Sequence, residues 1–246
     1  MREEILYGIN PVNEALSSGK VEIEKIYISQ DAFMGRIGSL LKKARERGIP
    51  VSNVPPEILR KIAGTGKNQG IVASVSAGRY LAREEILGST AKDAIILILD
   101  GVEDPGNFGA IIRSAVAAGI SGIFVPAKGS AGMTSITAKR SAGSILHAKI
   151  AREKSLITLA DVLKKRGFHL VAVEKKGEAR LFDAAFKFPL ALIFGSESKG
   201  IRKELIEKVD TVISIPMDDK VESLNISVAC GIVLYELVRR RLHSSI

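Results

Sequence analysis

Cysteine and histidine are scarce in this sequence of 246 residues, which has one cysteine and three histidines. The single Cys230 excludes an internal disulfide and a cysteine-based zinc site. His147, His169 and His243 are too dispersed along the chain to suggest a metal cluster. The sequence therefore predicts chemistry that uses no metal ion.

Long apolar runs are also lacking, since no run approaches the roughly 20 residues that a membrane-spanning helix needs. The chain begins MREEILYGINPVNEAL, with acidic residues early and no apolar segment of the kind found in secretory signals. These two absences predict a cytoplasmic protein without a membrane partner.

Positive charge is in excess, with 36 lysines and arginines against 27 acidic residues and a formal net charge of +9. Such a surface suits a polyanion, because phosphates bind lysine and arginine while releasing counterions. Many basic proteins have no nucleic-acid partner, so the charge alone leaves both interpretations open. No basic tail is present, so contacts with a nucleic acid would come from folded surfaces.

The order of apolar and polar segments predicts two domains. Residues 1–77 have the pattern of a small α/β domain, and residues 78–93, rich in charged and small residues, are expected to form a linker. From residue 94 strands and helices alternate regularly, beginning with the continuous apolar run AIILILD at 94–100. Residues 94–246 are therefore predicted to form a mostly parallel α/β sheet, in which ligands bind beyond the carboxyl ends of the strands.

The loop after the first of these strands contains a charged residue in an unusual place. The segment DGVEDPGNFG is followed by a predicted apolar helix over 110–118, with Arg113 expected in its first turn, near the mouth of the loop. An unpaired buried guanidinium is costly. Arg113 is therefore expected either to pair with a structural carboxylate or to reach into a functional site.

Two later loops have comparable polar residues. In FGSESKG, Gly195 and Gly200 bracket Glu197 and would let backbone approach a ligand closely, while the serines could simply cap a helix. In the third loop, Ser223 and Asn225 stand at the start of a predicted apolar helix over 224–241. Ser223 is expected as its N-cap, whereas a buried Asn225 would demand several hydrogen-bond partners.

Familiar nucleotide-binding motifs fail here. GTGKNQG at 64–70 lacks the leading glycine and the final Ser or Thr of a phosphate-binding loop. The loop after the strand at 94–100 does not supply G-x-G-x-x-G. A dinucleotide-binding enzyme and a glycine-rich open-sheet methyltransferase are both disfavoured.

The three loops instead resemble the motifs of one family. N-x-G-x-x-x-R matches Asn107, Gly109 and Arg113; G-x-E-x-x-G matches Gly195, Glu197 and Gly200; I-P-M followed by S-L-N-x-S-x-A matches Ile215, Pro216, Met217, Ser223, Leu224, Asn225, Ser227 and Ala229. In this order they are similar to the SpoU (TrmH) family of RNA ribose 2′-O-methyltransferases, over roughly residues 94–241.

The resemblance implies a SPOUT-type fold, a parallel sheet with a trefoil knot and helices on both faces. It implies the cofactor S-adenosyl-L-methionine, a homodimer with the active site near the subunit interface, and no metal. The cofactor positions are Gly195, Gly200, Ile215, Met217 and Leu224. The catalytic positions are Arg113, Asn107, Glu197, Ser223 and Asn225.

The family gives Arg113 the role of handling the proton of the 2′-hydroxyl. The guanidinium could lose its proton transiently, or it could stay charged and stabilise the developing alkoxide. The second account is preferred, because arginine normally stays protonated.

The first domain resembles the accessory RNA-binding domain of family members close to the bacterial 23S rRNA guanosine methyltransferases, a domain similar to a large-subunit ribosomal protein. This favours rRNA as substrate, with tRNA as the alternative. A non-catalytic RNA-binding assembly factor on the same scaffold and a nucleotide-binding metabolic enzyme are further alternatives.

Overall fold

The computed structural model describes residues 5–18, 22–32, 34–76 and 78–243. The chain divides into two compact units, unit 1 with residues 1–79 and 132–139 and unit 2 with residues 80–131 and 140–246. The segment expected as a linker contains the short helix α4 (Arg83–Leu87), whose Ile86 and Leu87 belong to the core of unit 2. Among the described helices, none is both long and apolar enough to cross a bilayer.

Unit 1 is a small α/β domain, as its alternating pattern predicts. Its four-stranded sheet has the order β1 (Ile5–Tyr7), β4 (Ile71–Val75), β2 (Ile23–Ser29), β3 (Val51–Val54), and only β2 and β3 run parallel. Three helices accompany the sheet: α1 (Ile9–Ser18), α2 (Met34–Glu46) and α3 (Pro56–Ala63). Apolar residues of α1, α2, β2 and β4 form one core.

A second stretch of chain, residues 132–139, also belongs to unit 1. The buried Glu24 of β2 accepts a 2.8 Å hydrogen bond from the backbone N–H of Met133. A Cβ atom added at Gly132 would lie 2.3 Å from Glu24 Oε2, so the carboxylate fits only because this residue is glycine. The buried acid thus fixes the start of this stretch.

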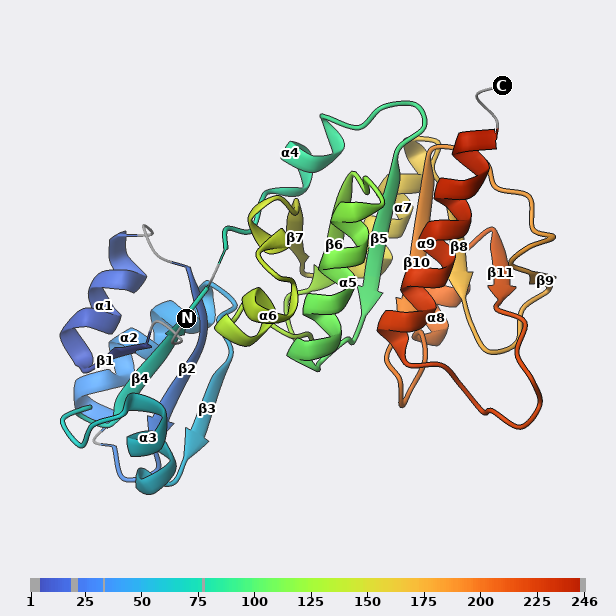
Figure 1. The fold of residues 1–246 in the computed structure, drawn as a ribbon. Coiled ribbons are helices and arrows are strands. Elements are labelled where there is room, and N and C mark those ends of the chain that lie inside the picture. Colours follow the sequence, from blue (N-terminus) through green and yellow to red (C-terminus); the bar gives the residue numbers. More distant parts are fainter. Residues whose placement is uncertain (1–4, 19–21, 33, 77, 244–246) are drawn as a thin grey trace. The chain divides into compact units, whose positions relative to one another are not determined.

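Unit 2 is built on a parallel sheet of seven strands (Figure 1). The order across the sheet is β7 (Ile150–Glu153), β6 (Gly122–Pro126), β5 (Ile95–Asp100), β10 (Leu190–Gly195), β8 (His169–Val173), β11 (Thr211–Ser214), β9 (Ala179–Arg180). Every pair is parallel, and all six residues of β5 are buried, as the run AIILILD predicts. The trefoil knot implied by the resemblance stays a prediction.

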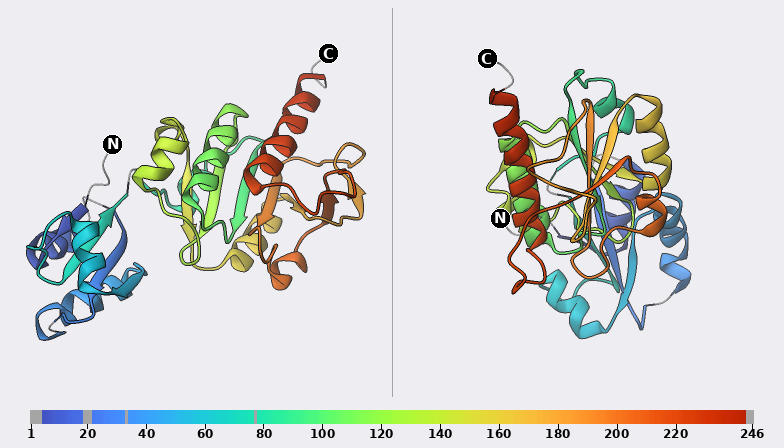
Figure 2. Two further views of the ribbon diagram at one scale, coloured as in Figure 1. Left: turned by 60° about the horizontal axis from the view of Figure 1, so that its bottom comes forward. Right: turned by 90° about the vertical axis from the view of Figure 1, so that its right-hand side faces the viewer.

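Helices cover both faces of this sheet, as the right-hand view of Figure 2 shows. The helices α5 (Pro105–Ala117) and α9 (Ile226–His243) pack together on one face, and α7 (Leu156–Lys165) and α8 (Lys203–Ile206) on the other. Burial on both faces explains why the central strands are apolar throughout rather than alternating. The 3₁₀ turn Ser144–Leu146 also belongs to this unit, whereas α6 (Ser135–Arg140) belongs to unit 1 except for its last residue.

The strand order reverses between β5 and β10. From β5 the chain continues through β6 to β7 at one edge, while β10, β8 and β11 lie on the other side of β5. At such a point the loops leaving the two central strands diverge and open a crevice at their carboxyl ends. The loops 101–104 and 196–202 leave the sheet there.

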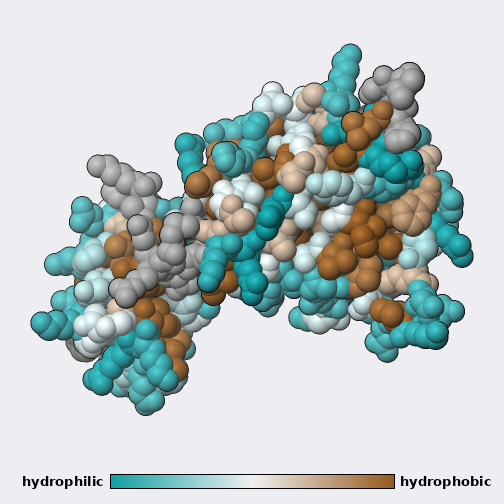
Figure 3. Space-filling model, viewed as in Figure 1, coloured by the Kyte–Doolittle hydropathy of each residue, from teal (hydrophilic) through white to brown (hydrophobic). Residues whose placement is uncertain are grey.

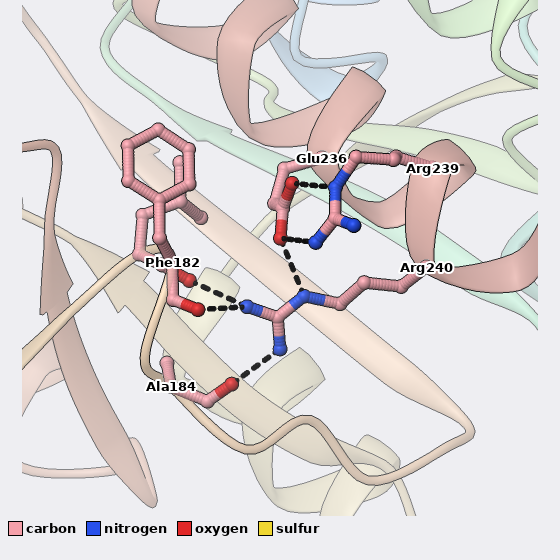
Figure 4. Close-up of polar contacts among 6 residues, drawn as sticks. Phe182, Ala184, Glu236, Arg239 and Arg240 are labelled. Carbon is pink, nitrogen blue, oxygen red and sulfur yellow. Dashed lines mark hydrogen bonds and ion pairs between the residues drawn. The ribbon is translucent and has the colours of Figure 1, made fainter. Parts of the chain in front are cut away.

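The C-terminal half of α9 is anchored by one guanidinium (Figure 4). Arg240 donates hydrogen bonds to the backbone carbonyls of Leu181, Phe182 and Ala184, and its Nε donates to Glu236 Oε1 at 2.6 Å. These bonds tie α9 to the segment that precedes β10. The helix whose first turn borders the crevice is therefore held firmly at its far end.

Candidate active site

The first turn of α5 lies at the crevice. The helix begins at Pro105, not at Ala110 as predicted, because Asp104 caps it and Oδ1 of Asp104 accepts a 2.7 Å hydrogen bond from the N–H of Asn107. Proline is well suited to the first helical position, where its missing N–H is not needed. Asn107 therefore lies in the first turn, with its side chain at the carboxyl end of β5.

The earlier start changes the position of Arg113. The prediction that Arg113 lies in the first turn is wrong, since it lies more than two turns into α5. Its side chain is exposed, and neither a structural carboxylate nor any other partner contacts it among the residues that the structure describes. The outer face of α5, rather than the crevice, carries this guanidinium.

Three side chains, from the first turn of α5, the loop after β10 and the residue before α9, meet at the crevice. Asn107 Nδ2 donates to Glu197 Oε1 at 3.2 Å, and Asn225 Nδ2 donates to Asn107 Oδ1 at 2.9 Å and to the same Glu197 oxygen at 2.7 Å. The backbone N–H of Ile226 adds a third bond to that oxygen, at 3.2 Å. We call Asn107, Glu197 and Asn225 the amide–carboxylate network. It joins segments up to 118 residues apart in the sequence.

Asn225 also starts α9. Its Oδ1 accepts hydrogen bonds from the N–H of Ser227 at 2.9 Å and from the Ser227 hydroxyl at 2.6 Å. The expectation that Ser223 is the N-cap is therefore wrong, because the helix begins at Ile226 and Asn225 occupies the capping position. The expectation of a buried amide is also wrong, since Asn225 is exposed although fully engaged.

The loop after β10 is a tight turn stabilised by its own backbone. Ser196 and Gly200 exchange backbone hydrogen bonds of 3.1 and 2.9 Å, and Ser196 Oγ accepts from the N–H of Lys199. A Cβ added at Gly195 would lie 2.0 Å from the carbonyl carbon of Gly200, so no larger residue fits there. Neither serine caps α8, which begins at Lys203. The turn holds Glu197 between its two ends.

Two acidic residues position this loop, one at the end of β5 and one directly after β8, and neither is among the site residues predicted from the sequence. The buried Asp100 pairs with Arg202 at 2.7 Å and also accepts from its backbone N–H, and the hydrogen bond raises the pKa of Arg202. Glu174 accepts a 3.0 Å bond from the N–H of Ile201. The available signal was a carboxylate directly after an apolar strand.

The loop separates two cavities of unit 2. The β10–β11 cavity, of about 330 Å³, has a mostly apolar wall with Phe194, Ile215, Met217, Leu224 and Ala229. The β5–β10 cavity, of about 440 Å³, is lined by four carboxylates and three cationic side chains: Asp100, Glu103, Asp104, Glu197, Lys128, Lys199 and Arg202.

The predicted site residues distribute over these features. The β10–β11 cavity is lined by the five predicted cofactor residues and by one predicted catalytic residue: Gly195, Gly200, Ile215, Met217, Leu224 and Ser223. Asn107 lines the β5–β10 cavity, Glu197 lines both, and Asn225 is bonded to both of these residues. Arg113 is the one predicted residue that lies outside this assembly.

Cys230 takes no part in the site. Its side chain is fully buried within α9, and burial raises the pKa of its thiol. The burial identifies Cys230 as a small core residue rather than a nucleophile. Among the described residues, no group of three or more His, Cys, Asp or Glu side chains is placed to hold a metal ion.

A parallel α/β domain with two cavities at a strand-order reversal, beside a fixed amide–carboxylate network, is typical of an α/β enzyme domain with its site at the carboxyl ends of the strands. The model of the SpoU rRNA Methylase family matches residues 94–235 of this domain. A second model, for RNA 2′-O ribose methyltransferase substrate binding, matches residues 5–81. The chain belongs to the SpoU methylase family.

Relatives match almost the whole chain. The 23S rRNA (guanosine-2′-O-)-methyltransferase RlmB of Shewanella oneidensis is 35% identical over 98% of this chain and 98% of its own length. AviRb of Streptomyces viridochromogenes, a SpoU methyltransferase crystallised with the cofactor AdoMet, is 25% identical with a TM-score of 0.64, over 98% of this chain and 92% of AviRb. The A. aeolicus TrmH/SpoU tRNA modifying enzyme is 30% identical with a TM-score of 0.56, over 66% of this chain and 82% of that one.

Proposed function

We propose that this chain transfers the methyl group of S-adenosyl-L-methionine to the ribose 2′-hydroxyl of a guanosine in 23S rRNA. The observation that carries the proposal is the amide–carboxylate network, which joins all three family motifs at the boundary between two cavities. A protein that only binds RNA has no need of such a network. The full-length relative named above acts on 23S rRNA guanosine.

The β10–β11 cavity suits the cofactor. Its apolar wall from Ile215, Met217 and Leu224 can enclose an adenosine. Gly195 lets the backbone of Gly200 pack directly against it, which keeps the turn beside this cavity tight. Ser223 lies at the same cavity and can offer a hydroxyl to the ligand or the substrate. AviRb, which shares this fold, binds the same cofactor.

The cofactor supplies an activated methyl group on sulfur, so the protein mainly aligns the reactants and manages a proton. Glu197 and the two asparagines orient the ribose beside the cofactor cavity. As the hydroxyl proton leaves to solvent, a charged guanidinium from Arg113 stabilises the negative charge that develops on the 2′-oxygen. Arginine suits this role, because its planar fork of donors stays protonated.

A second copy of the chain is required to bring Arg113 into the site. Arg113 lies on the outer side of α5, and the neighbouring α9 exposes an apolar row spaced by seven residues: Val228, Tyr235 and Leu242, with exposed fractions of 50%, 53% and 68%. Figure 3 shows apolar side chains gathered over α9 and the strands beside it. Such a row favours burial against another molecule. We propose that two copies pair through this face and place Arg113 at an active site.

Unit 1 is proposed to bind the RNA. The substrate-binding family model matches it, and the net charge of +9 favours phosphate contacts. We propose the division into an accessory domain at 1–77, a linker at 78–93 and a methyltransferase domain at 94–246. Since ribosomal RNA of a bacterium lies in its cytoplasm, we place the activity there.

Transfer to tRNA is the second candidate, because a TrmH/SpoU tRNA modifying enzyme shares the fold. That enzyme matches only 66% of this chain, whereas the rRNA enzyme matches 98%. The longer match favours rRNA.

The test is transfer of a tritiated methyl group to 23S rRNA and to tRNA from cells that lack this protein, followed by mapping of the methylated nucleotide. We expect incorporation at one guanosine of 23S rRNA. Arg113→Ala should abolish transfer, and Arg113→Lys should fail too, while both keep cofactor binding and fold. No incorporation into any RNA, or wild-type turnover by Arg113→Ala, would contradict the proposal.

Pairing is tested by the mass in solution and by activity on dilution. Wild type should have twice the mass of the 26.4 kDa chain, and Tyr235→Arg should be a monomer that binds cofactor but does not transfer methyl. Full activity of a monomeric Tyr235→Arg would show that pairing is not needed.

A further inference from the structure

The β5–β10 cavity lies directly beside the proposed cofactor cavity, and nothing in the proposed function yet occupies it. We propose that this cavity receives the target nucleotide and that the carboxylate of Glu103 recognises its guanine base. The inference rests on the proposed function and adds to it the residue that selects the base.

The position of the cavity suits the second reactant. The loop from Ser196 to Gly200 and the side of Ile226 line both cavities, and Glu197 projects from that loop. Two bound molecules that exchange a methyl group must lie in contact, with the reacting atoms a few ångströms apart. A volume of about 440 Å³ lies within the range of cavities that hold small ligands.

Among the four carboxylates of this cavity, three are already engaged. Asp100 pairs with a guanidinium, Asp104 caps α5, and Glu197 belongs to the amide–carboxylate network. Glu103 has no hydrogen-bond or ion-pair partner in the described part of the chain and is exposed. Its Oε1 would lie 3.8 Å from a Cβ added at Gly129, so the carboxylate stands over backbone that no side chain covers. Glu103 can therefore accept hydrogen bonds from a ligand.

The chemistry of a carboxylate singles out guanine. An ionised carboxylate is an acceptor only, with two oxygens side by side. Guanine presents two adjacent donors on its Watson–Crick edge, N1–H and the N2 amino group, which match those two oxygens. Adenine, cytosine and uracil each place an acceptor beside their donor on that edge, so they offer Glu103 one hydrogen bond and one repulsion. Unstacked RNA bases are commonly read on this edge.

Two lysines complete the cavity, in addition to Arg202, which is already paired with Asp100. Lys128, after β6, and Lys199, in the loop after β10, both line it and are exposed. Their ammonium groups can neutralise the phosphates on either side of an inserted nucleotide. A base-reading acid with flanking cations fits a nucleotide of RNA rather than the amino-acid end of the cofactor.

The experiment changes one functional group of the RNA and one functional group of the protein. A target RNA is assembled with either guanosine or inosine at the methylated position, since inosine keeps N1–H but lacks the N2 amino group. The kcat/KM of wild type is measured on both RNAs and compared with Glu103→Gln and with the control Glu178→Gln, an exposed acid that lines neither cavity. Cofactor affinity and thermal stability are measured for every variant.

Wild type and Glu178→Gln should lose about tenfold or more in kcat/KM when guanosine is replaced by inosine. Glu103→Gln should lose a similar factor on guanosine and discriminate little between the two RNAs, with unchanged cofactor affinity and stability. Glu103→Asp keeps the negative charge but has a shorter side chain. Its kcat/KM on the guanosine RNA should lie between those of wild type and Glu103→Gln.

Two results would overturn this inference while leaving the methyltransferase proposal standing. They are an unchanged preference for guanosine in Glu103→Gln and a weakened affinity of that variant for the cofactor. A mapped target other than guanosine would overturn both this inference and the proposed guanosine target. Wild type that methylates no RNA would refute the proposed function itself, and the present inference with it.

Discussion

Replacing Arg240 by alanine should destabilise unit 2 substantially. The guanidinium makes hydrogen bonds to the carbonyls of Leu181, Phe182 and Ala184, and lies over the ring of Phe186 at 4.9 Å. Alanine leaves those three carbonyls without their donor. Charged donors contribute about 1 kcal/mol or more each, and a cation over a ring about 0.5–1 kcal/mol.

Partial solvent access reduces that sum. The Arg240 side chain is 26% exposed, so water can replace some of the lost bonds. We therefore expect a loss of about 2–3 kcal/mol in the free energy of unfolding. For a protein of this size that corresponds to a fall in Tm of about 5–10 °C.

The control for this prediction is the neighbouring Arg239. Arg239→Ala also removes a cation that pairs with Glu236, but the Arg239 side chain is 57% exposed, and Arg240 still pairs with Glu236 in that variant. Urea unfolding followed by circular dichroism should give a clearly smaller loss for Arg239→Ala. Equal losses in the two variants, or a loss below about 1 kcal/mol for Arg240→Ala, would refute the assignment of Arg240 as the anchor.

Three further predictions follow from the geometry. Gly195→Ala should weaken cofactor binding by about tenfold or more, because its Cβ overlaps the following loop; calorimetry of binding checks this. Asn225→Ala should lower kcat by about tenfold to a hundredfold and stability by about 1 kcal/mol, because the network and the helix cap lose their amide; turnover and thermal melts measure the two effects. Bonds from Arg239, then from Arg240, lower the pKa of Glu236 to about 2 from an ordinary 4.5, so their stabilisation is complete above about pH 4.5 and disappears as the pH falls toward 2. Acid unfolding of Glu236→Gln should lack this slope, and an identical slope in the variant would exclude Glu236 as its cause.

The sequence predicts the strands of unit 2 well for a physical reason. A strand buried on both faces must be apolar at every position, and the runs that became β5 and β10 have that pattern. Their carboxyl ends are then marked by the first polar residues. The sequence therefore places the polar loops 100–109 and 195–200 at the same edge of the sheet, and in the structure the two loops line one cavity.

The first residues of the helices are predicted less well, because a capping side chain can start a helix within a segment whose composition is typical of a loop. The segment Asp104–Gly109 contains a proline and two glycines, which favour a loop in a sequence pattern. The Asp104 cap and Pro105 at the first position stabilise a helix there instead. Similarly, the sequence pattern favours Ser223 as the N-cap of α9, although serine and asparagine are both common N-cap residues and Asn225 has that position in the structure. The pairing of Asp100 with Arg202 could not be predicted, since it joins residues 102 positions apart.

The position of Glu197 is fixed by segments that are far apart in the sequence. Glu197 stands on an exposed turn, where a lone carboxylate would sample many rotamers and lose alignment. Three donors from α5, the loop before α9 and the first turn of α9 all reach one of its oxygens, Oε1. The side chain is thereby fixed between the two cavities, with the second oxygen turned to neither Asn107 nor Asn225. Removing any one donor leaves the others in place. The loss of kcat in the double variant Asn107→Ala, Asn225→Ala should therefore differ from the product of the losses in the two single variants.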